Sequence, residues 1–238
     1  MQYPYDFTYT TLKKYFKEII SNGYKIIPCA EYIDYKKARK QYKIFVNRID
    51  IDISFGKAII MAEIFKELGI KCTYFVRLHA NEYNPFSFEN YKILKRLIET
   101  GNEIGYHSEI IDQSVIWNED AEKCLVRDIN VLNAILGIKI KGIASHGGIT
   151  GLNNLDFWKN RKASEFGLLY EAYDKQAEFG LFYESLYLSD SNYKWKCYKN
   201  GILQKDDTRS LGEHSKDNHQ IIYSTLHTDT FYNEHIYE

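Results

Sequence analysis

Apolar residues recur at helical spacing along the first 136 residues of the chain. In residues 8–22 (TYTTLKKYFKEIISN) they follow an i, i+3, i+4 pattern, and Asn-Gly closes the segment. This spacing gives a helix one apolar face. Similar patterns, each followed by a glycine, predict three further helices, over 56–68, 88–100 and 120–136.

Segments rich in β-branched and aromatic residues alternate with these helices. They predict strands over 43–53, 71–78, 102–108 and 138–148. The strand–helix–glycine unit repeats at roughly 30–40 residues, as parallel strands with crossover helices require. Less regular strands are predicted over 168–174, 184–190 and 220–227.

The alternation predicts one α/β domain over residues 1–238, built on a parallel sheet that is either open and doubly wound or closed into a barrel. Residues 1–42 are predicted to form an N-terminal helical extension packed on it. No Pro-, Gly- or Ser-rich linker divides the chain.

Composition narrows the class of protein. Hydrophobic residues make up 45% of the 238 residues and charged residues 26%, which allows a sizeable core. The net charge of −1 gives no electrostatic case for a nucleic-acid or anionic-membrane partner. The first residues lack a basic segment followed by an apolar one, and no apolar run approaches 18 residues. We therefore expect a cytoplasmic protein without a membrane span.

The four cysteines are scattered along the chain without C-x-x-C spacing; they are Cys29, Cys72, Cys124 and Cys197. This distribution predicts free thiols, with neither structural disulfides nor a cysteine zinc site.

Ionisable side chains occur at or near the carboxyl ends of the predicted strands. In residues 48–55 (RIDIDISF), strand geometry places Arg48, Asp50 and Asp52 on one face. Further polar residues end or follow other strands: His79, His107, His146, Asp190 and His227. Parallel strands bring such ends together at one edge of the sheet.

Histidines that converge with carboxylates indicate a transition-metal site with a position open for water. Two aspartates on one strand suit a division of roles, in which one binds the cation and the other takes a proton from water. Arg48 is placed to keep that base ionised and oriented. Three other histidines, His214, His219 and His235, lie in polar surroundings and are predicted at the surface.

The segment from Lys43 to Ser108 resembles the polysaccharide deacetylase family, which is carbohydrate esterase family four with its NodB-homology domain. Three stretches carry the resemblance: RIDID (48–52), KELGIKCTYFV (66–76) and LIETGNEIGYHS (97–108). Weaker likenesses follow in YLSDSNYKW (187–195) and STLH (224–227). The resemblance implies a distorted (β/α) barrel of about seven strands that removes acetyl groups from sugars with zinc or a similar ion.

The resemblance also implies roles for individual residues. Asp50 corresponds to the catalytic base and Asp52 to the metal-binding aspartate. His107 corresponds to the first histidine ligand, and His227 to the histidine that protonates the leaving amine. Asp190 is placed to orient His227.

Two departures from the family pattern change the expected ligand set. The position of the family's second histidine holds Ile111, and its Arg-x-Pro segment is absent where this chain has ASHGG (144–148). We expect His146 to supply the third ligand, with Glu109 as the other candidate, and Arg48 to replace the missing arginine. This variant pattern is similar to deacetylase-like proteins of lipopolysaccharide and capsule biosynthesis.

The prediction is a deacetylase that uses one divalent ion, Zn²⁺, on Asp52, His107 and His146. Its substrate would be an N-acetyl sugar, with nucleotide- and lipid-linked sugars among the candidates. Trp158 and Trp195 are candidates for a sugar platform or for the core. One alternative is a non-catalytic sugar-binding protein that kept the barrel, which the missing histidine favours and the retained aspartates and His227 oppose. Another is a phosphate-ester metallohydrolase, for which the chain lacks the extra ligands of a two-metal site.

Overall fold

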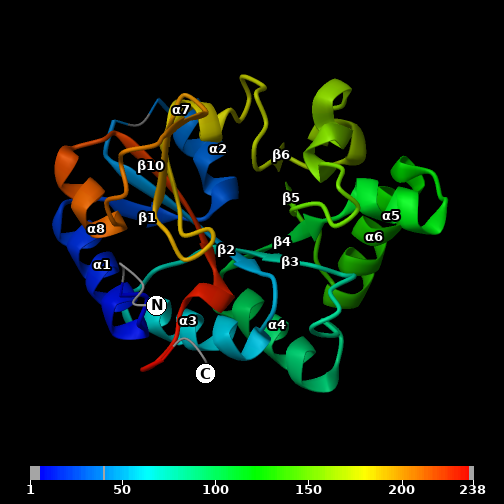
Figure 1. Ribbon diagram of the computed structural model, residues 1–238, viewed down its shortest axis with the longest axis horizontal. Coiled ribbons are helices and arrows are strands. Elements are labelled where there is room, and N and C mark those ends of the chain that lie inside the picture. The colour runs from blue at the N-terminus through cyan, green and yellow to red at the C-terminus, as the bar shows by residue number, and fades with distance from the viewer. Residues whose placement is uncertain (1–5, 40, 236–238) are drawn as a thin grey trace.

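A largely parallel β-sheet with helices on both faces is the framework of the protein (Figure 1). The computed structural model describes residues 6–39 and 41–235. Its α-helices are α1 (Tyr9–Ser21), α2 (Cys29–Lys37), α3 (Phe55–Glu67), α4 (Phe88–Glu99), α5 (Ile110–Trp117), α6 (Ala121–Leu136), α7 (Leu181–Glu184) and α8 (Leu211–His214). Its strands are β1 (Lys25–Ile27), β2 (Ile44–Ile51), β3 (Thr73–Val76), β4 (Glu103–Ser108), β5 (Gly142–Ser145), β6 (Tyr170–Glu171), β7 (Leu186–Ser189), β8 (Lys196–Lys199), β9 (Ile202–Gln204) and β10 (Ile221–His227). The predicted α/β class is confirmed.

The strands follow the order β6-β5-β4-β3-β2-β10-β7-β8-β9, and β1 pairs with the start of β2. Pairing is parallel from β6 to β7 and antiparallel from β7 through β8 to β9. The longest strand, β2, therefore lies between β3 and β10. In its register with β10, Asp50 lies opposite His227 and Arg48 opposite Thr225.

The two faces of β2 contact different parts of the core. Phe45, Ile49 and Ile51 belong to the hydrophobic cluster that includes apolar residues of α1, α3, α4 and α6. Ile44 and Val46 belong to a second cluster that includes residues of α2. Every residue of β2 is buried, so the polar face that alternation gives Arg48 and Asp50 lies inside the protein.

Most predicted strands are present, but two are much shorter than predicted. The segment 138–148 contains only the four residues of β5, and 168–174 only the two of β6. A close approach explains the lack of side chain at Gly142 in β5, because a Cβ atom there would lie 1.9 Å from the Tyr170 ring. The ring thus packs directly on the β5 backbone, and its hydroxyl donates to Glu103 at 2.8 Å.

The N-terminal region contains more structure than the helical extension that the sequence predicts. α1 is present as predicted, and the following segment adds β1 to the sheet and α2 to the core. The short elements α5, α7, α8, β8 and β9 were also missed. Each of them has only three to eight residues, which is short for a periodic pattern.

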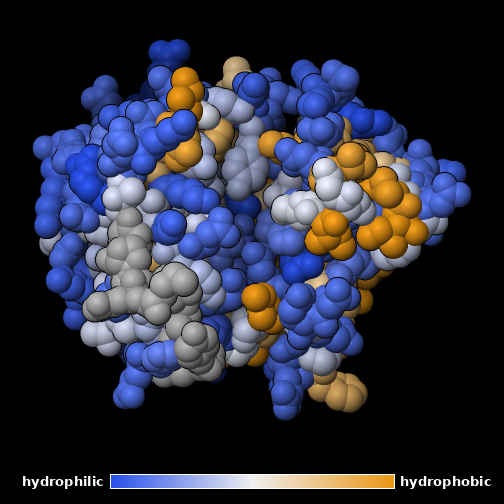
Figure 2. All heavy atoms as spheres, viewed as in Figure 1, coloured by the Kyte–Doolittle hydropathy of each residue, from blue (hydrophilic) through white to orange (hydrophobic). Residues whose placement is uncertain are grey.

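An apolar region of the surface lies over α5. Figure 2 shows exposed hydrophobic side chains over α5, where Val115, Ile116 and Trp117 are each at least 42% exposed. Within the described residues, every helix is too short or too polar to cross a membrane. All four cysteines are free of disulfides, as predicted, and all four are buried.

Candidate metal centre

Three predicted ligands lie together at the carboxyl-terminal edge of the sheet. Asp52 directly follows β2, His107 is the penultimate residue of β4, and His146 directly follows β5. One ligand atom from each lies within 4.8 Å of the others. One carboxylate and two imidazoles are a ligand set that suits a catalytic zinc ion.

The contacts of the two imidazoles fit metal binding. His107 Nδ1 lies 2.9 Å from the Ala144 carbonyl oxygen, so Nδ1 carries the proton and Nε2 is left to bind. Nε2 lies 3.3 Å from Asp52 Oδ1, a buried oxygen with no hydrogen-bond partner among the described residues. Two acceptors at this distance need a proton or a cation between them. Burial lowers the pKa of His107, but Asp50 and Asp52 outweigh that effect and raise it.

The side chain of Glu109 lies beside the predicted ligand group. Its Oε1 contacts His146 Nδ1 at 3.1 Å and accepts hydrogen bonds from Arg77 at 2.8 and 3.2 Å. Glu109 thus orients His146, whose Nε2 remains available as a ligand atom. Of the two candidates for the third ligand, only His146 belongs to the converging group.

Arg77 is a part of the site that the sequence analysis missed. It directly follows β3, and its Nη1 donates to the Asp52 backbone carbonyl at 3.0 Å. The signal was present, since Arg77 comes at the end of the buried strand TYFV. A buried charge in that position needs partners, and Arg77 has Glu109 and the Asp52 backbone.

Arg48 and Asp50 form a buried ion pair. Arg48 Nε and Nη2 donate to the two carboxylate oxygens of Asp50 at 2.8 and 2.7 Å, and both side chains are at most 2% exposed. The ring centroids of Phe75 and Tyr173 lie 5.0 and 4.9 Å from the guanidinium carbon of Arg48. Burial raises the pKa of Asp50, but Arg48 and then His107 lower it below its ordinary value. Asp50 is therefore held ionised.

His227 approaches Asp50 from the neighbouring strand. Its Nδ1 lies 2.5 Å from Asp190 Oδ1, and its Nε2 lies 4.0 Å from Asp50 Oδ2. Burial lowers the pKa of His227, but Asp190, Asp50 and Asp52 together raise it to about 10. The imidazole is consequently a proton donor near pH 7.

Several other residues named from the sequence lie outside this centre. His79 contacts Asp128 at 3.0 Å. Trp195 is buried against Phe7 and Tyr15, so it belongs to the core. His235 is exposed and His219 partly so.

The prediction that His214 lies at the surface is wrong, because its side chain is fully buried. It ends α8, which packs against α1. This contact between distant segments cannot be read from the polar residues around His214.

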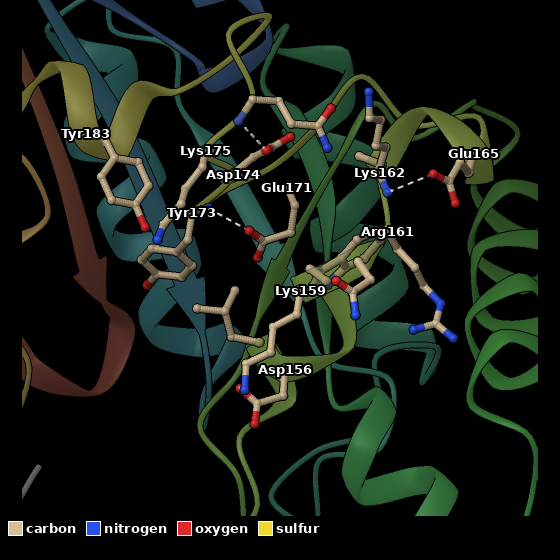
Figure 3. Close-up of a pocket in the computed structure, with 15 residues that line it drawn as sticks. Asp156, Lys159, Arg161, Lys162, Glu165, Glu171, Tyr173, Asp174, Lys175 and Tyr183 are labelled. Carbon is tan, nitrogen blue, oxygen red and sulfur yellow. Dashed lines mark hydrogen bonds and ion pairs between the residues drawn. The ribbon is translucent and has the colours of Figure 1, made fainter.

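A pocket of about 540 Å³ is lined by Glu171 and Tyr173, two residues in contact with the surroundings of the centre, but not by the candidate ligands themselves (Figure 3). Tyr173, Lys175 and Tyr183 lie on one side of it, and Lys159, Arg161 and Lys162 on the other. Trp158 also lines it. Glu171 joins the pocket to the centre, because its carboxylate accepts the N–H of Ser145, the residue before His146, at 3.1 Å. Tyr173 makes a second connection through its contact with Arg48.

The centre as a whole combines three side chains that could bind a metal ion, a second carboxylate and an imidazole with a raised pKa, and two residues connect it to a polar pocket. These are the groups that hydrolysis of an amide or ester requires. Comparison of the chain with models of protein families and with curated proteins found no match.

Proposed function

We propose that the protein is a metal-dependent deacetylase that hydrolyses the N-acetyl group of a sugar. The observation that carries the proposal is the convergence of Asp52, His107 and His146 beside Asp50 and His227. We also propose that it is related to the polysaccharide deacetylases. Its role would be in the cytoplasmic synthesis of surface polysaccharide.

Asp52, His107 and His146 would hold one divalent ion, and zinc suits their donor atoms. Bound there, the ion would supply a Lewis acid for the amide carbonyl and would lower the pKa of a water molecule. The approach of Asp52 Oδ1 to His107 Nε2 supports this assignment, as do the contacts of both Nδ1 atoms, which leave the Nε2 atoms of His107 and His146 for the ion.

Asp50 would accept a proton from the attacking water. The two hydrogen bonds from Arg48 fix the carboxylate and keep it ionised, which makes it a weak but permanently available base. The amide C–N bond then breaks, giving acetate and the free amino sugar.

His227 would donate a proton to the departing nitrogen. Asp190 supports this role because it holds Nδ1 and so directs Nε2 toward the Asp50 side of the centre. The base and the acid would therefore come from adjacent strands, β2 and β10.

The pocket next to the centre suits a sugar ligand. Its volume of about 540 Å³ lies within the usual range for small-molecule sites, roughly 300–1,000 Å³. Trp158, Tyr173 and Tyr183 offer aromatic faces, and the lysines and Arg161 offer hydrogen-bond donors to hydroxyl or phosphate groups.

We propose that the sheet closes into a distorted barrel. The side chains of Tyr173, which follows β6, and Tyr187 of β7 support it, because their hydroxyls lie 3.4 Å apart. This contact links the β6 end of the sheet to β7. The residues of α2 that pack against both regions would then fill the interior.

Acetate release from a panel of free, nucleotide-linked and lipid-linked N-acetyl sugars tests the function. We expect zinc-loaded protein to release acetate from at least one of them. Asp50→Asn should retain zinc and lose turnover, whereas His107→Ala should lose both. If the wild-type protein binds zinc and a sugar but releases no acetate, the non-catalytic sugar-binding alternative replaces this proposal.

A further inference from the structure

A second group of potential metal ligands lies at the other end of the sheet. Cys197 belongs to β8, Asp207 follows β9, and His214 ends α8. Their ligand atoms lie within 4.8 Å of one another. The predicted catalytic ligands belong to β4 and to the ends of β2 and β5, so the two groups share no residue and no strand.

His214 is the residue that points to a ligand. Its side chain is 0% exposed, and neither ring nitrogen makes a hydrogen bond to any described residue. Nε2 lies 3.3 Å from Asp207 Oδ1 but does not form a hydrogen bond with it. A buried imidazole without hydrogen bonds is costly, and a bound ion is one of the few ways to satisfy it.

We propose that Cys197, Asp207 and His214 bind a second divalent metal ion of the zinc class. Sulfur, nitrogen and oxygen donors are together typical of zinc sites. In a filled tetrahedral site the ligand atoms are roughly 3.5 Å apart, so small side-chain movements suffice to close the group. A water molecule or His219 would complete the coordination.

Arg209 supports this assignment. Its Nε and Nη2 donate to Asp207 at 3.0 and 2.8 Å, and its Nη1 donates to Asp217 at 2.6 Å. Asp207 Oδ1 accepts two N–H groups of Arg209, the backbone one at 3.3 Å and Nε at 3.0 Å. Among the described residues Oδ2 accepts only from Nη2, so Oδ2 keeps a lone pair that can bind an ion. The negative charges of a Cys197 thiolate, Asp207 and Asp217 would balance the positive charges of Arg209 and a divalent ion. Arg209 would thus orient a ligand from outside the coordination sphere.

A competing ligand set shares His214 but contains no sulfur: it consists of His214, Asp217 and His219. Asp217 and His219 are partly exposed, whereas Cys197 and His214 are fully buried. A buried set binds with less competition from water, which favours the cysteine-containing group. The ion would then link the β8–β9 hairpin to α8.

Cobalt substitution tests the proposal without measuring enzyme activity. A cysteine thiolate bound to Co²⁺ gives a charge-transfer absorption in the near ultraviolet, and the ligand set Asp52, His107 and His146 contains no sulfur. We expect Co²⁺-loaded protein to show this absorption and to contain two ions per chain. Cys197→Ser and His214→Ala should each lose the absorption and one ion.

Two further variants serve as controls. Cys124→Ser removes another buried thiol and should change neither the absorption nor the metal content. His107→Ala should lose the other ion and keep the absorption, so failure of the catalytic proposal would not hide this site. Retention of the catalytic ion by Cys197→Ser shows that this variant is folded.

Absence of the absorption in Co²⁺-loaded wild-type protein would overturn the proposal. So would a second ion that survives in Cys197→Ser and disappears in His219→Ala, because that result assigns the ion to the competing set.

Discussion

The carboxylate of Asp190 contacts His227 twice, at Nδ1 over 2.5 Å and at the backbone N–H over 3.1 Å. Asp190 is fully buried and directly follows β7, whose neighbour β10 ends with His227. The two contacts fix both the position of the imidazole and the nitrogen that carries its proton. The carboxylate is therefore a positioning group for the proposed acid.

Replacement of Asp190 by asparagine should separate positioning from metal binding. We expect Asp190→Asn to reduce turnover by about 10²–10⁴-fold, because His227 loses its orientation and the charge that raises its pKa. Zinc content should stay at the wild-type value. The measurements are acetate release and metal analysis, with the exposed Asp34→Asn as a matched control. Loss of zinc in Asp190→Asn would show a structural role instead.

Glu109 provides a test of the proposed ligand set. If it orients His146, then Glu109→Gln should weaken zinc affinity by about 10–100-fold without abolishing binding. His146→Ala should lower the affinity much further. Competition with a fluorescent zinc chelator measures both variants. Equal losses in the two would instead make Glu109 a ligand itself.

The buried pair of Arg48 and Asp50 should dominate the stability of this region. Arg48→Met should lower the free energy of unfolding by about 3–5 kcal/mol, because it removes both hydrogen bonds to a buried carboxylate and leaves only the longer contacts with His107 and His227. Adding Asp50→Asn should restore part of that loss, since an amide needs no counter-charge. Urea denaturation of Arg48→Met, Asp50→Asn and the double variant gives the coupling energy between the two side chains.

An exposed ion pair serves as the control for the Arg48–Asp50 measurements. Arg96 pairs with Glu63 at 2.7 Å, but both side chains are more than 40% exposed. Arg96→Met should therefore cost only about 0–1 kcal/mol. An Arg48→Met loss of that size would mean that the charge on Asp50 is neutralised in another way.

Glu171 should make stability depend on pH. Burial raises its pKa to about 7 from an ordinary value of 4.5. Between these values the native state keeps a proton that the unfolded state releases, so the free energy of unfolding falls as pH rises and the loss is complete above pH 7. The stability of Glu171→Gln relative to wild type should accordingly increase by about 3 kcal/mol between about pH 4.5 and pH 8.

Chemical denaturation at the two pH values measures this difference. At each pH, the difference between variant and wild type cancels the contributions of the other titrating groups. The change in this difference between the two pH values also cancels any pH-independent cost of placing an amide at this position. The exposed Glu178→Gln serves as the control. A constant difference across the range would contradict a raised pKa for Glu171.

Local patterns made much of this architecture predictable. The periodicity of α3, α4 and α6 and the β-branched runs of β2 and β3 are long enough to define each element without tertiary information. Asp52, His107 and His146 could be grouped because the edge of a parallel sheet collects strand ends.

Other features depend on contacts between distant segments. The burial of His214 follows from the packing of α8 on α1, and the partners of Arg77 are the residues that directly follow β2 and β4. β6 has only two residues, and pairing with β5 defines it more than its own sequence does. Such features are set by tertiary structure, to which local propensity gives little guide.

The pairing of β2 with β10 has a consequence for how this protein can change. Asp50 and His227 lie opposite each other because of main-chain hydrogen bonds between two central strands, and no loop sets their spacing. Insertions or deletions in the long segment between β5 and β7, which supplies the pocket walls, would leave that spacing intact. Descendants of this chain could thus change the pocket by remodelling one loop region while the spacing of the proposed base and acid stays the same.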